Sequence, residues 1–313
     1  RCRDAAHAGS WYPGDPAALR SDLEALLREA PRGLAEGRPP KALIVPHAGL
    51  QYCGRTASHA YANLQPAATQ RIVVLGPSHH KWIQGCALPV KGLSEYATPL
   101  GGLPLDVEAI EALRATGDFE ELSAREDEAE HSIEMQLPFV ALGMATTTTW
   151  SLLPIVVGDL PPKACARFAQ HLAPMFDDPS TLFLISSDFC HWGSFFSYAP
   201  CLPLSLPTLD LVPGMGCAGE ANPVNTGIEA LDLRGMELIC RQDGKAFLEY
   251  LEAEGNTICG QNPIRLLLEL LAMRPGCFRV RFLHYSQSRL LGSKPGRNDS
   301  SVSYAAGVCE VVA

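Results

Sequence analysis

The stretch VVLGPSHH (73–80) runs from an apolar, β-branched segment straight into two adjacent histidines. The same arrangement recurs in IVPHAG (44–49) and LISSDFCHW (184–192), and a further polar cluster, NTICG (256–260), follows a helical stretch. Open α/β sheets bind ligands just beyond the carboxyl ends of their strands, so side chains that are far apart in the chain meet there in one crevice. The candidate residues of these clusters are His47, His79, Asp188, His191 and Cys259.

Strand and helix patterns alternate over most of the chain. Apolar, mostly β-branched runs predict strands at 41–45, 71–75, 152–157, 181–186, 278–285 and 303–312. Helical spacing of apolar residues predicts helices at 16–30, 54–63, 106–115, 131–144, 162–175, 228–241, 244–253 and 263–273, the first of them capped by Asp15. This alternation predicts an α/β fold with a mostly parallel, doubly wound sheet and helices on both faces. The last two strands lack a helix between them, which favours an antiparallel edge.

The composition is typical of a compact globular protein. Of 313 residues, 47% are hydrophobic and 19% are charged, which argues against a disordered chain. This length suits one large α/β domain or two modest ones, and we expect a single domain over 1–313. The net charge of −9 argues against a nucleic-acid-binding protein, which normally carries a basic face. No apolar run approaches the length of a membrane span.

Cysteine usage and the first residues suggest a reducing compartment. The eleven cysteines are scattered, and none of them form a CxxC pair. The opening stretch RCRDAAHAGSWYPGD (1–15) holds no apolar segment of the kind that a secretory signal needs. We therefore expect reduced thiols, no structural disulfides and a cytoplasmic location, with a nuclear location also open.

A long irregular stretch stands apart from the alternating pattern. Residues 197–227 are rich in proline and glycine, show no sustained period and begin six residues after His191. A connection of this length is usually functional or mobile. It predicts either a lid over the site or a surface insertion.

The first two histidine clusters favour a shared metal site. Imidazole is the commonest metal ligand among side chains. A single histidine after a strand is more often a hydrogen-bonded turn residue, but His47 and His79 occupy equivalent positions after two successive strands. His80 would point in another direction from His79 and either pack or meet solvent.

The other two clusters add a thiol, a carboxylate and a further imidazole. Cys259 is either a third ligand, a reactive thiolate or a buried structural cysteine; a helix that begins near Asn262 would favour its ionised form. Asp188 and His191 fit an orienting carboxylate and a general base, and equally an N-cap and a surface histidine.

One further pair and several absent motifs narrow the function. His131 and Glu134 are three residues apart, so they would share a helix face and either support the site through hydrogen bonds or form an ordinary helix start. The chain contains no GxGxxG, GxxxxGK[ST], HExxH or GxSxG motif. Nucleotide binding and serine-hydrolase chemistry therefore have no support.

Over nearly its whole length the chain resembles the Memo family, named for mediating ErbB-driven cell motility. The stretches that carry the resemblance are HAGSWYPGD (7–15), PHAGLQYCG (46–54), RIVVLGPSHH (71–80), DEAEHSIEMQLPF (127–139), LPIVVG (153–158), SSDFCHWG (186–193), NTICGQNPI (256–264) and DSSVSYAAG (299–307). The family shares its fold with class III extradiol dioxygenases of the protocatechuate-cleaving type, non-haem iron enzymes that open catechol rings. The main departure is at 197–227, where the family usually has a shorter, more polar segment.

The resemblance implies a role for several residues. His47 and His79 match the two histidine ligands of the dioxygenases, and Cys259 falls where those enzymes have a glutamate ligand. His191 matches their general base, and Asp188 lies beside the metal. Trp11 and Tyr52 would line the mouth of the pocket.

The cysteine decides which function we expect first. A thiolate keeps the negative charge of the glutamate, but it is softer, prefers Cu(I), Zn or sulfur-ligated iron, and is open to oxidation. We therefore expect a protein that binds iron or copper, with zinc as another option, and acts in redox or metal homeostasis and as a signalling adaptor for cell motility. The alternatives are a non-haem Fe(II) extradiol dioxygenase for a catechol-like substrate, and a metal-independent protein that binds a phosphotyrosine peptide or small molecule at a vestigial site.

Overall fold

Four parallel strands form the centre of the fold in a computed structural model that describes residues 1–34, 39–200, 223–291 and 295–312. Their order across the sheet is β2 (Pro40–Val45), β9 (Thr181–Ser186), β3 (Arg71–Pro77) and β8 (Ser151–Val157). All but the first residue of β3 and of β8 are buried, so these strands read as continuous apolar runs. Their carboxyl ends lie at one edge, where the predicted clusters begin.

The sheet is mixed and not mostly parallel as the sequence predicted. β12 (Ser300–Val311) runs antiparallel to β2 and also pairs antiparallel with β10 (His191–Gly193) and β11 (Phe278–Gln287). At the other end β4 (Cys86–Leu88) is antiparallel to β8 and parallel to β7 (Glu120–Glu121). The antiparallel edge expected from the last two strands is therefore correct, because strands that follow one another without a crossover helix pair antiparallel.

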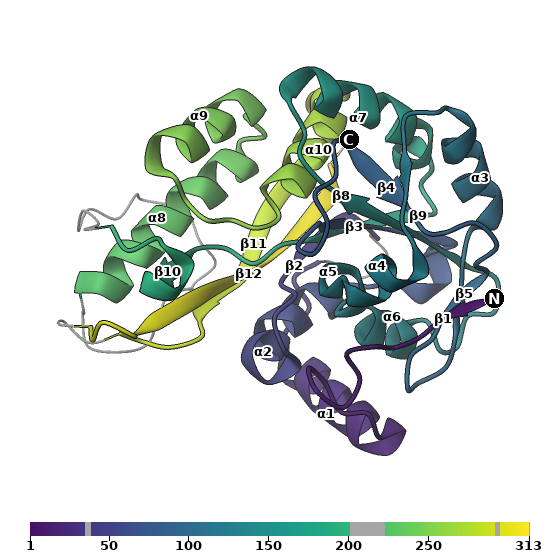
Figure 1. Cartoon of the computed structure of the whole chain (residues 1–313), viewed down its shortest axis with the longest axis horizontal. Helices are drawn as coiled ribbons and strands as arrows, with labels where there is room; N and C mark the ends of the chain where they lie inside the picture. Colours follow the sequence, from purple (N-terminus) through teal and green to yellow (C-terminus); the bar gives the residue numbers. More distant parts are fainter. Residues whose placement is uncertain (35–38, 201–222, 292–294, 313) are drawn as a thin grey trace.

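Helices cover both faces of the sheet, as the sequence predicted. Figure 1 shows α7 (Pro162–Asp177) and α10 (Gln261–Ala272) on one side. The other side carries α1 (Pro16–Glu29), α2 (Leu50–Tyr61), α5 (His131–Glu134) and α6 (Leu137–Gly143). The pair α8 (Pro223–Cys240) and α9 (Gly244–Glu254) extends the molecule beside β11.

The remaining elements are short. A small sheet joins β1 (Cys2–Arg3), β5 (Glu95–Tyr96) and β6 (Leu103–Pro104). Two helices, α3 (Val107–Ala115) and α4 (Ala124–Ala129), precede α5. The 3₁₀ turns are Pro66–Ala68 and Ser194–Phe196.

Local chemistry explains where several helices begin and end. Asp15 caps α1 by accepting from the Ala18 amide at 2.8 Å, as predicted. The single helix predicted at 131–144 is split into α5 and α6. Pro138 has no N–H to donate and its ring disfavours a helix that continues through it, so it sits in the first turn of a new helix.

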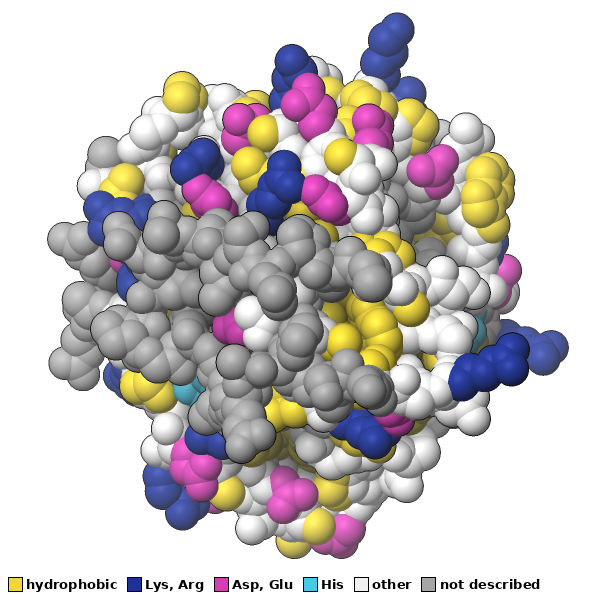
Figure 2. Space-filling view, turned by 90° about the vertical axis from the view of Figure 1, so that its left-hand side faces the viewer, with side chains coloured by type: hydrophobic (Ala, Val, Ile, Leu, Met, Phe, Trp, Pro, Cys, Tyr) yellow, Lys and Arg dark blue, Asp and Glu magenta, His cyan; other side chains and the backbone are white. Residues whose placement is uncertain are grey.

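The predicted insertion at 197–227 is only partly visible. Residues 201–222 lie outside the described residues, and α8 already begins at Pro223, five residues before the helix predicted from 228. Figure 2 views the molecule from the side of α8 and α9, where described side chains of both charges are interspersed and hydrophobic ones gather near the centre.

Two further properties bear on the expectations from composition. The described cysteines are free thiols, namely Cys2, Cys53, Cys86, Cys165, Cys190, Cys240, Cys259, Cys277 and Cys309. None of the helices in the described part of the chain is long and apolar enough to cross a bilayer.

A buried arginine ties β1 to the segment that leads into the site. Arg3 is only 2% exposed and pairs with Asp127 at 3.1 Å and Glu134 at 2.8 Å. Replacing Arg3 by Met would leave two buried carboxylates without their cation, so we expect the free energy of unfolding to fall by about 3–5 kcal/mol in urea denaturation. The matched control is Arg20→Met, which removes the exposed pair with Glu24 and should cost about 0.5 kcal/mol or less. Equal losses in the two variants would contradict this account.

Candidate metal centre

Three imidazoles converge at the carboxyl ends of the central strands. Ligand nitrogens of His47, His79 and His131 all lie within 4.8 Å of one another. His47 is the second residue after β2 and His79 the second after β3, while His131 opens α5. Asp188 is likewise the second residue after β9, which lies between β2 and β3 in the sheet. Because each of these three residues follows its strand by two positions, and the strands are neighbours in the sheet, the three side chains lie close together.

The tautomer of His47 is fixed by a serine. The Ser186 hydroxyl donates to the Ser132 carbonyl at 2.7 Å, so its oxygen must accept the hydrogen of His47 Nδ1, also at 2.7 Å. Nδ1 of His47 therefore carries the proton, and the lone pair of Nε2 faces the Cys259 thiol at 3.2 Å. Burial first, and then the charges of His79 and His131, hold the pKa of His47 well below its ordinary value. The ring is thus a neutral imidazole, the form that binds metals.

A carboxylate fixes the tautomer of His79, with the hydrogen again on Nδ1. Its Nδ1 donates to Glu130 at 2.9 Å, and its backbone N–H donates to the other oxygen of Glu130 at 2.6 Å. Burial alone would raise the pKa of Glu130, but the hydrogen bonds and charge of His79 lower it to about 2. A carboxylate that holds the far nitrogen of a ligand histidine is the usual second partner in metal sites.

The segment from Glu130 to Gln136 holds several strand ends at once. The Ser132 hydroxyl donates to the carbonyl of Pro77 at 2.7 Å, at the end of β3. The Gln136 amide donates to the carbonyl of Pro46 at 3.1 Å and to the Ser186 hydroxyl at 2.9 Å. This segment therefore fixes the ends of β2, β3 and β9 relative to one another.

His131 lies closer to the centre than the sequence suggested. The sequence predicts either support of the site through hydrogen bonds or an ordinary helix start, but the ring packs against His79 with centroids 4.3 Å apart and belongs to the converging group. Its Nδ1 is buried without a hydrogen-bond partner. Burial first, then the charge of His79, lowers the pKa of His131 to about 3. Trp11 packs on the other side of the ring at 4.6 Å.

Cys259 lies beside His47 but is not a member of the converging histidine group. Its Sγ is 3.2 Å from Nε2 of His47 and accepts the Asp188 N–H at 3.3 Å. The start of α10 does not ionise this thiol, contrary to the sequence expectation, because burial and the nearby Asp188 raise the pKa of Cys259 well above its ordinary value. In the metal-free protein a thiol therefore faces a neutral imidazole.

Asp188 and His191 border the centre from the β9 side. A carboxylate oxygen of Asp188 accepts the backbone N–H of His47 at 2.8 Å. Burial raises the pKa of Asp188, although the charge of His191 opposes this. Nδ1 of His191 donates to the carbonyls of Phe189 at 2.9 Å and Thr257 at 3.1 Å, so Nε2 is the nitrogen left to exchange a proton with a ligand. A general base needs one such nitrogen.

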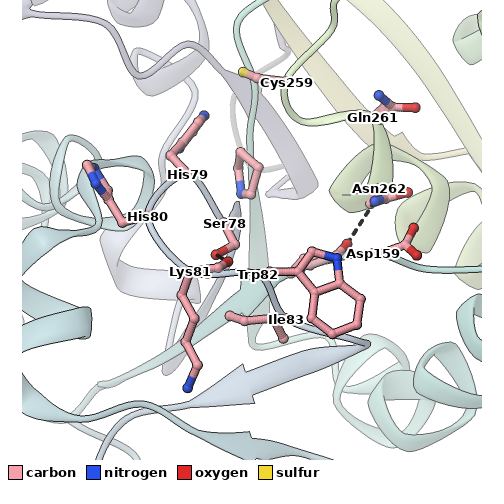
Figure 3. Close-up of a pocket in the computed structure, with 13 residues that line it drawn as sticks. Ser78, His79, His80, Lys81, Trp82, Ile83, Asp159, Cys259, Gln261 and Asn262 are labelled. Carbon is pink, nitrogen blue, oxygen red and sulfur yellow. Dashed lines mark hydrogen bonds between the residues drawn. The ribbon is translucent and has the colours of Figure 1, made fainter.

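Two pockets adjoin the centre. One of about 420 Å³ is lined by His79 and Cys259, and Figure 3 shows these residues together with Trp82, Asp159 and Asn262. The His80 ring meets the edge of the His131 ring, with centroids 5.7 Å apart. The other pocket, of about 410 Å³, is lined by Trp11, Ala48, Gly49, Tyr52 and Tyr304, among others. Tyr52 is 60% exposed at this second pocket.

Glu134 supports the site indirectly, through residues that surround it. It does not contact the three converging rings but accepts from Arg3, from the Tyr12 hydroxyl at 2.8 Å and from Nδ1 of His7 at 2.9 Å. Sequence reasoning missed Glu130, Ser186, Gln136 and His7. Glu130 directly precedes His131 in EHSIEMQ, so a carboxylate beside a candidate ligand was the one available signal.

The donor set fits a transition-metal ion. Bonds of about 2.0–2.1 Å to nitrogen and about 2.3 Å to sulfur place two such ligands of one ion roughly 3.1–3.6 Å apart. The separation of 3.2 Å between Cys259 Sγ and His47 Nε2 already satisfies this range. The fixed tautomers and the unpartnered nitrogen of His131 point to the same conclusion.

Fold and site together define an α/β protein whose strand ends present a histidine cluster suited to a metal ion. The chain belongs to the Memo family: the model of the family described as Memo-like protein matches residues 3–308. Proteins named MEMO1 from Homo sapiens and Danio rerio are each 40% identical to this chain, covering 99% and 98% of it and 98% and 96% of their own length. The memo-1 homolog of Caenorhabditis elegans is 40% identical over 98% of this chain and 82% of its own length.

The orienting role of Glu130 can be tested by Glu130→Gln. The amide keeps the shape but loses the charge that holds Nδ1 of His79, so we expect metal affinity to fall about 10–100-fold in a competition titration with a chelator. Glu128→Gln is the matched control, since Glu128 contacts none of the three converging histidines among the interactions identified, and its affinity should stay within about twofold of the unaltered protein. An unchanged affinity in Glu130→Gln would refute this role.

The ionisation of Glu134 should make the free energy of unfolding depend on pH in the acidic range. Burial would raise its pKa, but the hydrogen bonds of His7 and the charge of Arg3 lower it from 4.5 to about 2. A lowered folded pKa gives stability that is present above pH 4.5 and lost as pH falls towards 2. We expect Glu134→Gln to be less stable by about 3 kcal/mol near neutral pH, with the difference shrinking towards zero at about pH 2. Denaturation curves at several pH values check this, and a difference that is independent of pH would contradict it.

Proposed function

We propose that this protein binds one iron or copper ion at the centre formed by His47, His79 and Cys259, with His131 as a further donor, and acts in redox or metal homeostasis. The observation that carries the proposal is the convergence of three imidazoles within 4.8 Å, two of them with Nδ1 already committed to Ser186 and Glu130. Those contacts turn the Nε2 lone pairs toward the centre, where that of His47 meets the Cys259 thiol at 3.2 Å.

The choice between Cys259 and His131 affects which metal is held. A set with the thiolate is softer and favours Cu(I), zinc or sulfur-ligated iron, whereas three imidazoles also suit Cu(II), Ni and Fe(II). We favour the set with Cys259 because its distance from His47 already matches that of two ligands on one ion. A bound ion of this kind would supply a redox couple or a Lewis acid.

The protein's own groups around such an ion are arranged to bind and to accept protons. Nε2 of His191 is the nitrogen that can exchange a proton with a ligand, because its Nδ1 is engaged by two carbonyls. The pocket of about 420 Å³ beside His79 has room for a small ligand. Asp188 keeps His47 in place through the backbone N–H.

Metal binding can be followed by the proton that it displaces. At about pH 8 ordinary imidazoles are already neutral, while the thiol of Cys259 must lose its proton to bind a metal. We expect calorimetry in buffers of different ionisation enthalpy to give about one metal and about one released proton per chain. Cys259→Ser should abolish the proton release, and His79→Ala should abolish tight binding.

The control is His171→Ala, which removes a histidine that pairs with Asp118 away from the centre and should change neither stoichiometry nor proton release. Tight binding that survives both His47→Ala and His79→Ala would exclude this site. Binding without proton release would replace Cys259 by His131 in the ligand set.

A second candidate is a non-haem Fe(II) extradiol dioxygenase for a catechol-like substrate. The free Nε2 of His191 supports it, because ring opening needs a base for a catechol proton. The thiol in place of a carboxylate ligand weighs against it. Oxygen uptake with a panel of catechols, after anaerobic loading with Fe(II), separates the two. Turnover that His191→Ala abolishes would favour this reading over the first.

A third candidate is an adaptor in cell-motility signalling that binds a phosphotyrosine peptide. The half-open pocket between Trp11 and Tyr52 supports it by offering aromatic walls to a peptide side chain. Peptide binding that persists after complete chelation, and that is lost in Tyr52→Ala, would favour an adaptor whose metal site is vestigial.

A further inference from the structure

A buried carboxylate lies behind the two loops that bring His191 and Cys259 to the centre. Asp232, in the middle of α8, is fully buried and forms no ion pair among the described residues. One of its oxygens accepts the backbone N–H of Cys190 at 3.2 Å and the side-chain amide of Asn256 at 3.0 Å. The other accepts the Tyr285 hydroxyl at 2.9 Å.

Each of the first two contacts belongs to a different loop. Cys190 directly precedes His191, and Asn256 begins the turn that ends in Cys259 and the start of α10. The two loops are also joined to each other, because the hydroxyl of Thr257 accepts the His191 N–H at 2.7 Å and donates to the His191 carbonyl at 3.0 Å. One carboxylate oxygen thus sets the spacing of both loops.

A buried carboxylate is costly unless something requires it. Burial raises the pKa of Asp232 to about 6 even though four hydrogen bonds, from Asn256, Ser303, Tyr285 and the backbone of Cys190, oppose this. The side-chain carbonyl oxygen of Asn256 is buried without a partner, so this residue is held through its amide nitrogen alone, by Asp232 and by the Tyr250 hydroxyl at 2.7 Å. These hydrogen bonds restrain the position of the loop that carries Asn256.

We propose that Asp232 is a positioning residue for the candidate metal centre: from α8 it holds the loop of His191 and the loop of Cys259 in the register that turns both side chains toward the centre. The metal-binding role of the two loops rests on the proposed function, whereas the contacts of Asp232 with these loops do not depend on it. It also ties the site to α8, the helix that follows residues 201–222 in the chain.

The test measures the position of the Cys259 loop without any metal. In the metal-free protein the sulfur of Cys259 is held between the Asp188 N–H at 3.3 Å and Nε2 of His47 at 3.2 Å, so we expect slow alkylation by iodoacetamide, resolved by peptide mass spectrometry. Asp232→Asn should speed alkylation of Cys259 at least about fivefold, while Cys277, which lies away from these loops, reacts at an unchanged rate. Cobalt(II) then serves as the metal probe, and its thiolate charge-transfer band should weaken at least about threefold in this variant.

Two further variants distinguish positioning from ordinary stability. Asn256→Leu removes the contact of Asp232 with one loop and should act like Asp232→Asn, which also keeps the test open if the latter does not fold. Tyr285→Phe removes a hydrogen bond of the same carboxylate that reaches β11 and touches neither loop, so Cys259 alkylation should stay within about twofold.

The outcomes separate this inference from the proposed function. Faster Cys259 alkylation in Asp232→Asn and Asn256→Leu, but not in Tyr285→Phe, supports the positioning role. The absence of a cobalt(II) thiolate band in the unaltered protein would remove Cys259 from the ligand set of the proposed function and would leave the positioning role unaffected. Unchanged alkylation in both loop variants, or an equal increase in Tyr285→Phe, overturns the positioning role.

Discussion

The whole centre depends on hydrogen bonds that fix the far nitrogen of each candidate ligand. An imidazole can offer a metal only one nitrogen at a time, and which one it offers is decided by the partner of the other. Here Ser186 and Glu130 take the hydrogens of His47 and His79. Without these contacts the same two rings would be ordinary turn histidines that could rotate and change tautomer.

Those hydrogen bonds come largely from one short segment. Glu130, Ser132 and Gln136 lie within seven residues and together reach the ends of β2, β3 and β9. The segment is itself held by the ion pair of Glu134 with the buried Arg3. The buried ion pair therefore holds the segment 130–136, this segment holds the ends of three strands, and these contacts fix the orientation of the His47 and His79 rings.

The opposite side of the centre is held in a different way. Asp188, Cys259 and His191 come from two loops that are linked through Thr257 and anchored on Asp232 of α8. Burial keeps the Cys259 thiol protonated and the His47 ring neutral in the absence of metal. These two donors are thus neutral, with Glu130 and Asp188 close by to balance the charge of a cation.

The sequence located the strand ends well because buried parallel strands leave a simple signal. Runs such as LIV before His47 and IVVL before His79 are continuous apolar stretches, and the polar residue that follows must lie at the edge of the sheet. The place of His131 was not predictable from helical spacing. The predicted helix at 131–144 is divided into α5 and α6, so the apolar spacing of the whole stretch does not fix the direction of a ring at its first residue.

Other features depend on contacts between distant residues. Short strands such as β4, β7 and β10 have too few residues for a pattern, and the antiparallel pairing of β4 with β8 follows from tertiary packing. The roles of Ser186 and Asp232 need the hydrogen bonds themselves, because a serine in a strand or an aspartate in a helix carries no signal of its own. The predicted roles of Cys259 and His191 remain predictions that solution measurements must decide.

X-ray absorption spectroscopy of the metal-loaded protein tests the central claim most directly. The account predicts a coordination shell of two or three imidazole nitrogens at about 2.0–2.1 Å and one sulfur at about 2.3 Å, with the sulfur lost in Cys259→Ser. A shell made only of oxygen and nitrogen atoms that is unchanged in His47→Ala would contradict it, because it would mean that the fixed imidazoles hold nothing.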